Sequence, residues 1–162
     1  MFIRETTEAD AVGIAQVVKQ ISEIHSVADV SLEDVVERIR SGLSKVDQTG
    51  TSEVLVGVTK EGEIAGYCAV HWVPFLFLSG GEAYITELFV RPSDRGSGLG
   101  SSLLTEVEKR ARERGCARLS LINGRDGESY KRSFYLKRNW IERARMANFI
   151  LPISTGTHKP PQ

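Results

Sequence analysis

A glycine-rich turn between a strand and a helix restricts the fold of this chain more than any other feature. Glycines stand at positions 96, 98 and 100. They lie between an apolar stretch over 82–90, typical of a strand, and a stretch over 98–114 whose apolar residues recur at helical spacing. Glycines let a ligand approach the backbone closely, and a helix start offers unpaired N–H groups and the positive end of the helix dipole. The turn is therefore predicted to bind an anion such as a pyrophosphate within an α/β fold.

Several kinds of phosphate-binding turn compete for this segment, besides a glycine-rich helix start that holds no ligand. A P-loop needs Gly-Lys-Ser/Thr at the helix start, and the sequence Gly-Ser-Ser over 100–102 lacks the lysine, which excludes it. A dinucleotide-binding turn needs the spacing G-x-G-x-x-G in the first strand–helix unit, whereas more than half of this chain precedes the glycines and their spacing is G-x-G-x-G. A third phosphate-binding pattern, Arg/Gln-x-x-Gly-x-Gly/Ala, is matched by Arg95, Gly98 and Gly100.

Hydrophobic spacing along the rest of the chain predicts one mixed central sheet flanked by helices. Helices are expected to begin at Thr7 and Ser31, each followed three residues later by an aspartate as in a capping box, and a polar loop is expected over 44–52. The fold class is therefore α/β (α+β), in the order β-αα-βββ-α-β-α-β. The predicted strands cover 2–5, 53–59, 64–73, 82–90, 117–122 and 140–151, and the later helices cover 98–114 and 128–138.

The composition is that of an ordinary folded protein, with 162 residues and 21 Lys and Arg balancing 21 Asp and Glu. A nucleic-acid-binding protein normally carries a basic excess. The longest apolar run, 69–78, is too short to span a bilayer, and the first residues lack the pattern of a secretory signal. The two cysteines are too far apart in sequence for metal-ligand spacing. We therefore expect a cytoplasmic protein with no nucleic-acid partner, no membrane partner and no metal.

Three segments together resemble the GNAT superfamily of acyl-CoA-dependent N-acetyltransferases. Residues 84–92 resemble its central strand, residues 95–100 followed by two leucines resemble its CoA-binding motif, and residues 134–137 resemble its Phe-Tyr-x-Lys-x-Gly-Phe ending. The chain departs from that ending, because Asn139 and Trp140 replace the glycine and the phenylalanine. Asparagine tolerates a left-handed turn and tryptophan is again an aromatic anchor, so the local geometry is expected to survive.

The resemblance implies a single GNAT-like domain over 1–151, followed by a flexible C-terminal tail over 152–162. It also implies acetyl-CoA as co-substrate, without a metal. Backbone N–H groups of the turn would hold the pyrophosphate, and the central strand would pair with the pantetheine arm like an additional strand. The implied binding residues are Leu88, Phe89, Val90, Arg95, Gly96, Ser97, Gly98, Leu99, Gly100 and Ser101.

The implied reaction is direct transfer, in which an unprotonated amine attacks the thioester carbonyl and expels the CoA thiolate. Tyr135, at the position of the family's tyrosine, would protonate the departing thiolate. Glu87 is the candidate base because it is the polar exception in an apolar strand beside the expected thioester. Strand alternation would place Glu87 on one face with Ile85 and Phe89. A carboxylate buried on such a face is costly, so its presence there calls for an explanation. Glu82 and a carboxylate-held water remain alternatives.

The acceptor is not specified by any motif in the sequence. A primary amine of an unidentified small molecule is the leading expectation. The alternatives are a protein lysine or N-terminus as acceptor, and a non-catalytic module that binds or senses acyl-CoA. The resemblance also admits a homodimer.

Overall fold

The computed structural model describes residues 1–21, 24, 27–151 and 153. Of the predicted tail over 152–162, all residues except Ile153 lie outside the described part. The chain clusters into two compact units, Met1–Ile122 and Asn123–Gln162. None of the described helices combines the length and the apolar character needed to cross a membrane.

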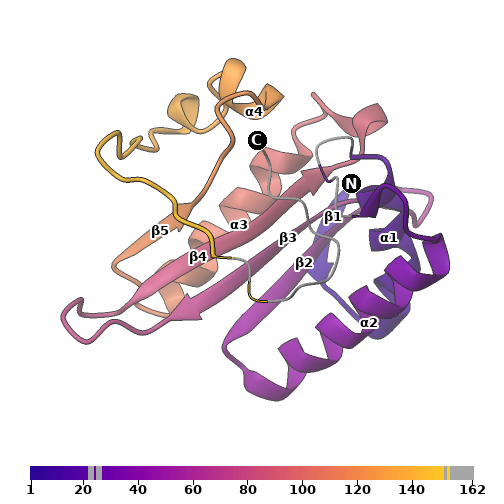
Figure 1. The fold of residues 1–162 in the computed structure, drawn as a ribbon, viewed down its shortest axis with the longest axis horizontal. Coiled ribbons are helices and arrows are strands. Elements are labelled where there is room, and N and C mark those ends of the chain that lie inside the picture. Colours follow the sequence, from indigo (N-terminus) through magenta and orange to yellow (C-terminus); the bar gives the residue numbers. More distant parts are fainter. Residues whose placement is uncertain (22–23, 25–26, 152, 154–162) are drawn as a thin grey trace. The chain divides into compact units, whose positions relative to one another are not determined.

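A five-stranded sheet in the order β1-β2-β3-β4-β5 forms the centre of the first unit (Figure 1). The strands β1 (Phe2–Glu5), β2 (Ser52–Val58), β3 (Ile64–Val73) and β4 (Glu82–Val90) run antiparallel to their neighbours, and β5 (Arg118–Leu121) pairs with β4 in parallel. The expected mixed sheet is therefore confirmed. Because β5 runs parallel to β4, the chain must cross over the sheet between the two strands, and a helix forms this connection.

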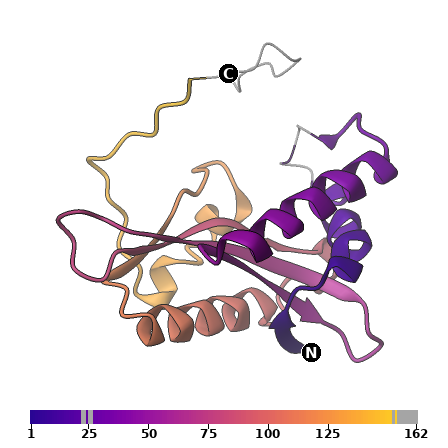
Figure 2. The same cartoon turned by 90° about the horizontal axis from the view of Figure 1, so that it is seen from below.

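Helices cover both faces of this sheet (Figure 2). One face carries α1 (Ala11–Lys19) and α2 (Leu32–Thr49), and the other carries α3 (Leu99–Glu113). The predicted loop over 44–52 is wrong for most of its length, because α2 continues to Thr49 and ends at Gly50, whose φ is +61°. Polar residues are compatible with the exposed face of a helix, so polarity alone did not mark where this helix stops.

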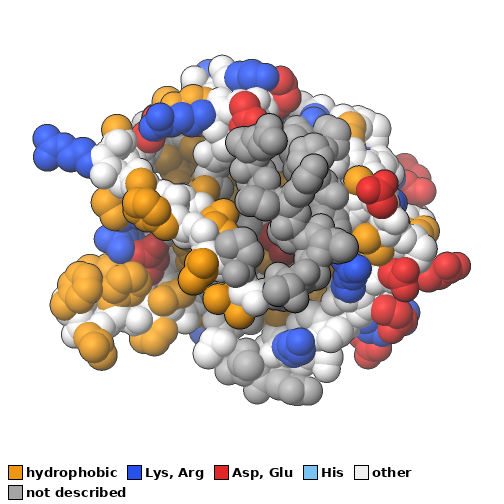
Figure 3. All heavy atoms as spheres, viewed as in Figure 1, with side chains coloured by type: hydrophobic (Ala, Val, Ile, Leu, Met, Phe, Trp, Pro, Cys, Tyr) orange, Lys and Arg blue, Asp and Glu red, His pale blue; other side chains and the backbone are white. Residues whose placement is uncertain are grey.

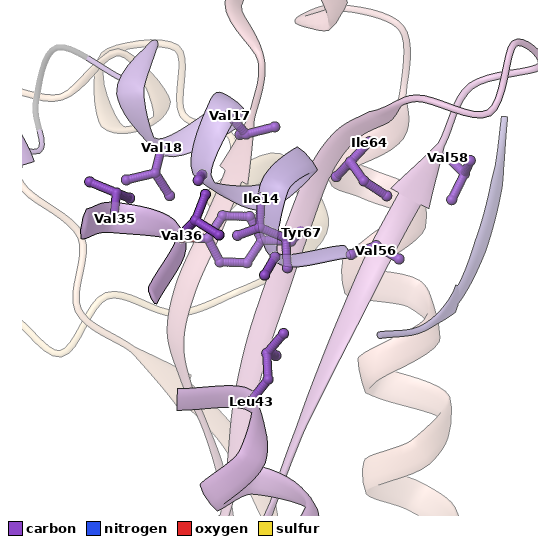
Figure 4. Packing of buried hydrophobic residues seen from close by; sticks show 12 residues of the cluster. Ile14, Val17, Val18, Val35, Val36, Leu43, Val56, Val58, Ile64 and Tyr67 are labelled. Atoms are coloured by element: carbon purple, nitrogen blue, oxygen red, sulfur yellow. The ribbon is translucent and has the colours of Figure 1, made fainter. Parts of the chain in front are cut away.

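The hydrophobic core between the sheet and α1 and α2 joins both helices to the strands (Figure 4). Tyr67 of β3 contributes its ring to this core and is only 4% exposed. On the other face, Leu99 at the start of α3 is buried against Gly57 of β2, where a Cβ would lie 2.3 Å from Leu99 Cδ1. Only glycine permits this close approach of helix and sheet. The labelled members of the first cluster are Ile14, Val17, Val18, Val35, Val36, Leu43, Val56, Val58, Ile64 and Tyr67.

The connection between β3 and β4 is an irregular loop over 74–81. Its Leu76 and Phe77 are 108% and 85% exposed, and Figure 3 shows hydrophobic side chains gathered at this end of the hairpin. Arg118 of β5 lies over the ring of Phe75, with its guanidinium carbon 5.4 Å from the ring centroid. The loop is thus attached at its base while its tip is exposed.

The second unit contains less regular structure than the sequence predicts. The expected helix over 128–138 is divided into α4 (Glu128–Lys131) and a 3₁₀ turn, Leu136–Arg138. Ser133 interrupts it with a φ of +56°, a left-handed conformation that an α-helix does not accommodate.

The predicted final strand over 140–151 is wrong, because the described residues of that segment form no strand. A strand exists only when a neighbour accepts and donates its backbone hydrogen bonds. The structure gives this segment a turn, in which the N–H of Met146 bonds the carbonyl of Arg143 at 3.0 Å. Ile141 and Phe149 are 89% and 91% exposed, so the β-type sequence is not buried either.

An ion pair fixes the first strand to the start of α1. The guanidinium of Arg4 donates two hydrogen bonds to the carboxylate of Asp10, at 2.6 and 2.8 Å, and the N–H of Thr7 donates a third at 2.7 Å. Asp10 is only 8% exposed. The hydrogen bond from Arg4, together with those from Thr7, holds the pKa of the Asp10 carboxyl below its ordinary value despite burial.

We predict that Asp10→Asn lowers the free energy of unfolding by about 1–3 kcal/mol at pH 7, because a buried charge-assisted pair is lost. A carboxyl whose pKa is lower in the folded state stabilises the fold above its unfolded pKa, and the stabilisation is lost as the pH falls through the folded value. Urea titrations at several pH values should therefore show the difference between wild type and variant shrinking below about pH 4. A difference that stays constant into the acid range would contradict this.

Candidate functional site

The strands β4 and β5 part halfway along β4 (Figure 1). Residues 82–85 of β4 pair with Arg118–Leu121 of β5, and among the described residues the sheet register gives 87–90 a strand partner on β3 alone. The second half of β4 therefore has one edge without a neighbouring strand. Such an edge offers N–H and C=O groups to an extended chain that adds itself to the sheet.

A β-bulge lies where this parting begins. Glu87 pairs with Ala69 and Ile85 pairs with Val70, so Thr86 is one residue in excess on β4. The Thr86 hydroxyl donates to the carbonyl of Ala69 at 3.4 Å. An extra residue bends a strand and increases its twist, which turns the following residues away from their previous direction.

The glycine turn has a backbone that glycines adopt more readily than other residues. Gly96 and Gly98 have φ values of +84° and +89°, in the left-handed region that other residues rarely occupy. Gly98 precedes α3, whose first residue, Leu99, donates its N–H to Ser97 Oγ at 3.4 Å. The first N–H groups of a helix have no partner within the helix, and they lie at its positive end. The strand–turn–helix unit therefore has the local geometry of an anion-binding helix start.

Ion pairs hold the turn against the sheet. Arg91 donates to Asp94 at 2.6 Å and to Glu63 at 3.0 Å, which joins the end of β4 to the turn and to the β2–β3 connection. The next basic residue, Arg95, is exposed and donates from Nε to the carbonyl of Val90 at 3.4 Å. The turn thus carries an exposed positive charge close to the open edge of β4.

Glu87 lies on β4 directly after the bulge. Its carboxylate accepts a hydrogen bond of 2.5 Å from the phenol of Tyr67. The expectation that Glu87 is buried is wrong, since the residue is exposed while Tyr67 is not. Burial and the neighbouring Glu87 raise the pKa of Tyr67, and the same two causes raise the pKa of the Cys68 thiol to about 12.

The bulge also corrects the predicted alternation on β4. Phe89 and Glu87 both meet Tyr67, the ring centroids of Phe89 and Tyr67 being 5.9 Å apart. Ile85 pairs with Val70, which follows Ala69 on β3 and therefore points to the opposite face. Glu87 and Phe89 thus share a face without Ile85, because the extra residue at 86 shifts the alternation by one.

Glu82, the alternative base, lies at the other end of β4 and is 6% exposed. Its carboxylate accepts hydrogen bonds from the guanidinium of Arg118 and from the Ser120 hydroxyl, both on β5. Both of its oxygens therefore have partners on the neighbouring strand. This pairing favours a structural role, in which Glu82 connects the paired halves of β4 and β5.

Tyr135 belongs to the second unit, where it is half-buried among aromatic residues. Its ring centroid lies 5.0 Å from that of Phe134 and 5.6 Å from that of Trp140. Asn139 has a φ of +63°, and the N–H of Trp140 bonds the carbonyl of Tyr135 at 3.1 Å. The prediction that asparagine and tryptophan preserve the left-handed turn and the aromatic anchor is confirmed.

The family model described as the acetyltransferase (GNAT) family matches residues 20–140 of the chain. The chain belongs to the GNAT acetyltransferase family. The match covers the glycine turn, the open half of β4 and the aromatic segment around Tyr135.

Individual relatives agree with this membership. A thialysine N-epsilon-acetyltransferase from Bos taurus is 27% identical over 129 residues, which cover 75% of this chain and 73% of the relative. A transcriptional regulator from Bacillus halodurans has a similar structure, with a TM-score of 0.77, 24% identity and coverage of 93% and 98% of the two chains. An aminoglycoside acetyltransferase from an uncultured soil metagenomic sample has a TM-score of 0.73 at 17% identity over 94% and 96%. These two similarities show the fold.

Sequence reasoning about this GNAT acetyltransferase did not single out Tyr67. A tyrosine in a β-branched-rich strand is typical of a core residue, and Tyr67 does belong to the core. Its contact with Glu87 depends on the register between β3 and β4 and on the bulge, neither of which has a local sequence signal. A tyrosine and a glutamate on adjacent predicted strands were the only available indication.

We predict that Arg118→Met lowers the free energy of unfolding by about 2 kcal/mol, because it leaves the buried Glu82 carboxylate without its cation. The loss stays below that of a fully buried pair because Arg118 is 41% exposed. Urea denaturation measures the change. Arg112→Met, at an exposed position on α3, is the matched control and should change stability by less than about 0.5 kcal/mol. Equal stabilities of Arg118→Met and wild type would contradict the structural role of Glu82.

Proposed function

We propose that this GNAT acetyltransferase transfers the acetyl group of acetyl-CoA directly to a primary amine of a small molecule. The observation that carries the proposal is the open edge of β4 beside the glycine turn at the start of α3. The open strand edge suits the extended, amide-bearing arm of CoA, and the helix start suits its pyrophosphate.

Binding of acetyl-CoA rests mainly on backbone groups. N–H groups within 95–101 hold the pyrophosphate, chiefly those other than Arg95, Ser97 and Leu99, whose N–H groups donate to Pro92, Asp94 and Ser97. Arg95 adds a positive charge near it. The backbone of Leu88, Phe89 and Val90 pairs with the pantetheine arm as an additional strand would. This geometry brings the thioester toward the bulge, where an N–H group of β4 polarises its carbonyl.

Proton transfer is assigned to side chains. The carboxylate of Glu87 accepts a proton from the ammonium or from the attacking amine, directly or through a water. The amine nitrogen then bonds to the carbonyl carbon, and the carbon–sulfur bond breaks. The nitrogen releases its remaining excess proton to water, and Tyr135 donates its phenolic proton to the departing thiolate and is reprotonated from water. The products are an amide and CoA as a thiol.

The relatives support an amine as acceptor. The bovine relative is named for acetylation at a thialysine nitrogen, and it shares 27% identity with this chain. An amine is mostly protonated near pH 7, so an exposed carboxylate such as Glu87 suits both its attraction and its deprotonation.

We predict that the protein releases CoA thiol from acetyl-CoA in the presence of an amine panel, and that Glu87→Gln lowers kcat by about 10²–10⁴-fold. The change keeps size and hydrogen-bonding capacity but removes the base. A thiol-reactive dye follows turnover, and calorimetry checks that acetyl-CoA binding is retained. Tyr135→Phe should likewise lower kcat while leaving the Kd for acetyl-CoA unchanged.

Other outcomes of the same assay separate the alternatives. Tight acetyl-CoA binding without turnover on any amine, and unaffected by Tyr135→Phe, would overturn the enzyme in favour of a sensor. Turnover restricted to lysine-containing peptides or protein N-termini would overturn the small-molecule acceptor and retain the reaction. Full activity of Glu87→Gln would remove that residue from the mechanism.

We predict that Gly98→Ala weakens acetyl-CoA binding at least tenfold, because a side chain resists the left-handed φ on which the turn depends. Gly62→Ala is the matched control, since Gly62 has a φ of +90° against +89° for Gly98, and at both positions an added Cβ would have no atom within 4 Å. Both changes should lower stability by about 1–2 kcal/mol. Calorimetric titration should find weaker binding in Gly98→Ala alone, and equal affinities of both variants would refute the assignment of the turn.

A further inference from the structure

We infer that Tyr67 is a positioning residue for acetyl transfer, whose phenol holds the carboxylate of Glu87 in the orientation that receives the amine proton. The inference rests on the proposed function and adds a residue from outside the GNAT-like motifs. Tyr67 lies on β3, the strand next to the one that carries Glu87. Its phenol donates to Glu87 Oε2 at 2.5 Å.

The phenol is rigid because its ring belongs to the core. Tyr67 is 4% exposed, and Figure 4 shows its ring within the hydrophobic core, near Ile14 and Val36. The ring also contacts Phe89, which lies two residues beyond Glu87 on β4. A hydrogen-bond donor on a packed ring has few orientations available, so it restricts its partner. Glu87, which is exposed and has several rotatable bonds, is the group that gains order.

The bulge explains why these two residues meet. Ala69 is the direct cross-strand neighbour of Glu87, and Tyr67 lies diagonally across from it on the same face. If Thr86 were a regularly paired residue, unbroken alternation from Ile85 would place the side chain at 87 on the face of Ile85, away from Tyr67. The bulge, which lies where the pairing with β5 stops, therefore brings Glu87 to its donor.

The phenol of Tyr67 is protonated, and is therefore a hydrogen-bond donor, near neutral pH. Burial and the neighbouring carboxylate raise the pKa of Tyr67, so its proton stays on the phenol near neutral pH. Cys68, the other ionisable group of β3 that interacts with Glu87, is likewise held neutral because burial raises its pKa to about 12. Tyr67, the residue of β3 that donates to Glu87, is thus neutral. With Oε2 engaged by Tyr67, Oε1 is the oxygen offered to the substrate amine.

In a purely structural interpretation, the carboxylate of Glu87 only accepts the hydrogen bond of a phenol that the core would otherwise leave unpaired. The two readings differ in what depends on the carboxylate. If Tyr67 acts through Glu87, removal of its hydroxyl matters for turnover only while the carboxylate is present. If the hydroxyl only supports the fold, its removal has the same effect with either residue at position 87.

The experiment is a double-mutant cycle with Tyr67→Phe and Glu87→Gln, measured as thiol release in the whole protein. We expect Tyr67→Phe to lower kcat about tenfold with the KM for acetyl-CoA unchanged, as for the loss of one hydrogen bond to a charged group. In the Glu87→Gln background, the same change should have less than about a twofold effect. Tyr130→Phe is the matched control, because it removes an exposed phenol–carboxylate hydrogen bond of 3.0 Å to Glu142, and it should leave kcat unchanged.

Each outcome decides the inference. An equal loss in both backgrounds, or a wild-type kcat for Tyr67→Phe, overturns the positioning role of Tyr67. A wild-type kcat for Glu87→Gln instead overturns the proposed base, which is a separate failure. If Tyr67→Phe does not fold, Glu87→Asp provides the test, because it retracts the carboxylate from an unchanged Tyr67. We expect it to lower kcat with the KM for acetyl-CoA unchanged, and unaltered kinetics would overturn the inference.

Discussion

The backbone of β4 has two different surroundings along one strand, and the rest of the site depends on this change. Over 82–85 the strand is hydrogen-bonded on both sides, to β3 and to β5. Beyond Ile85 it keeps β3 and loses β5, at the same place where Thr86 adds a residue to the ladder. Glu82 strengthens the closed half through its contacts with Arg118 and Ser120. The doubly paired first half therefore anchors β4, while the second half keeps one edge available for binding.

Backbone and side chains have separate tasks in the proposed reaction. The open edge and the glycine turn recognise a ligand through N–H and C=O groups, which depend on conformation rather than on side-chain identity. The acid–base chemistry depends on a few side chains, of which Glu87 is ordered by a neighbour in the core. Substitutions on the surface of α2 or α3 are accordingly expected to affect neither task directly.

Features with a local physical cause were predicted from the sequence. The left-handed turn at Asn139 follows from the asparagine, and the start of α2 follows from Ser31, whose hydroxyl accepts from the N–H of Asp34. The mixed sheet followed from hydrophobic spacing. The bulge at Thr86 was not predictable in this way, because register results from the packing of two strands against both helical layers.

The remaining errors have similar physical causes. The end of α2 depended on Gly50 and not on the polarity of the residues before it. The segment over 140–151 has a β-type composition, but composition supplies no partner strand. The contact between Tyr67 and Glu87 joins residues 20 positions apart and depends on the same unpredicted register.

The contact between Gly57 and Leu99 makes the position of the glycine turn depend on a residue that lies far from the turn. Gly57 lies on β2, which β3 separates from β4, yet its missing side chain determines how closely the start of α3 approaches the sheet. A larger residue at 57 would have to displace the buried side chain of Leu99, on whose packing the first turn of α3 rests. The position of the glycine turn thus depends on a buried residue two strands away from it in the sheet.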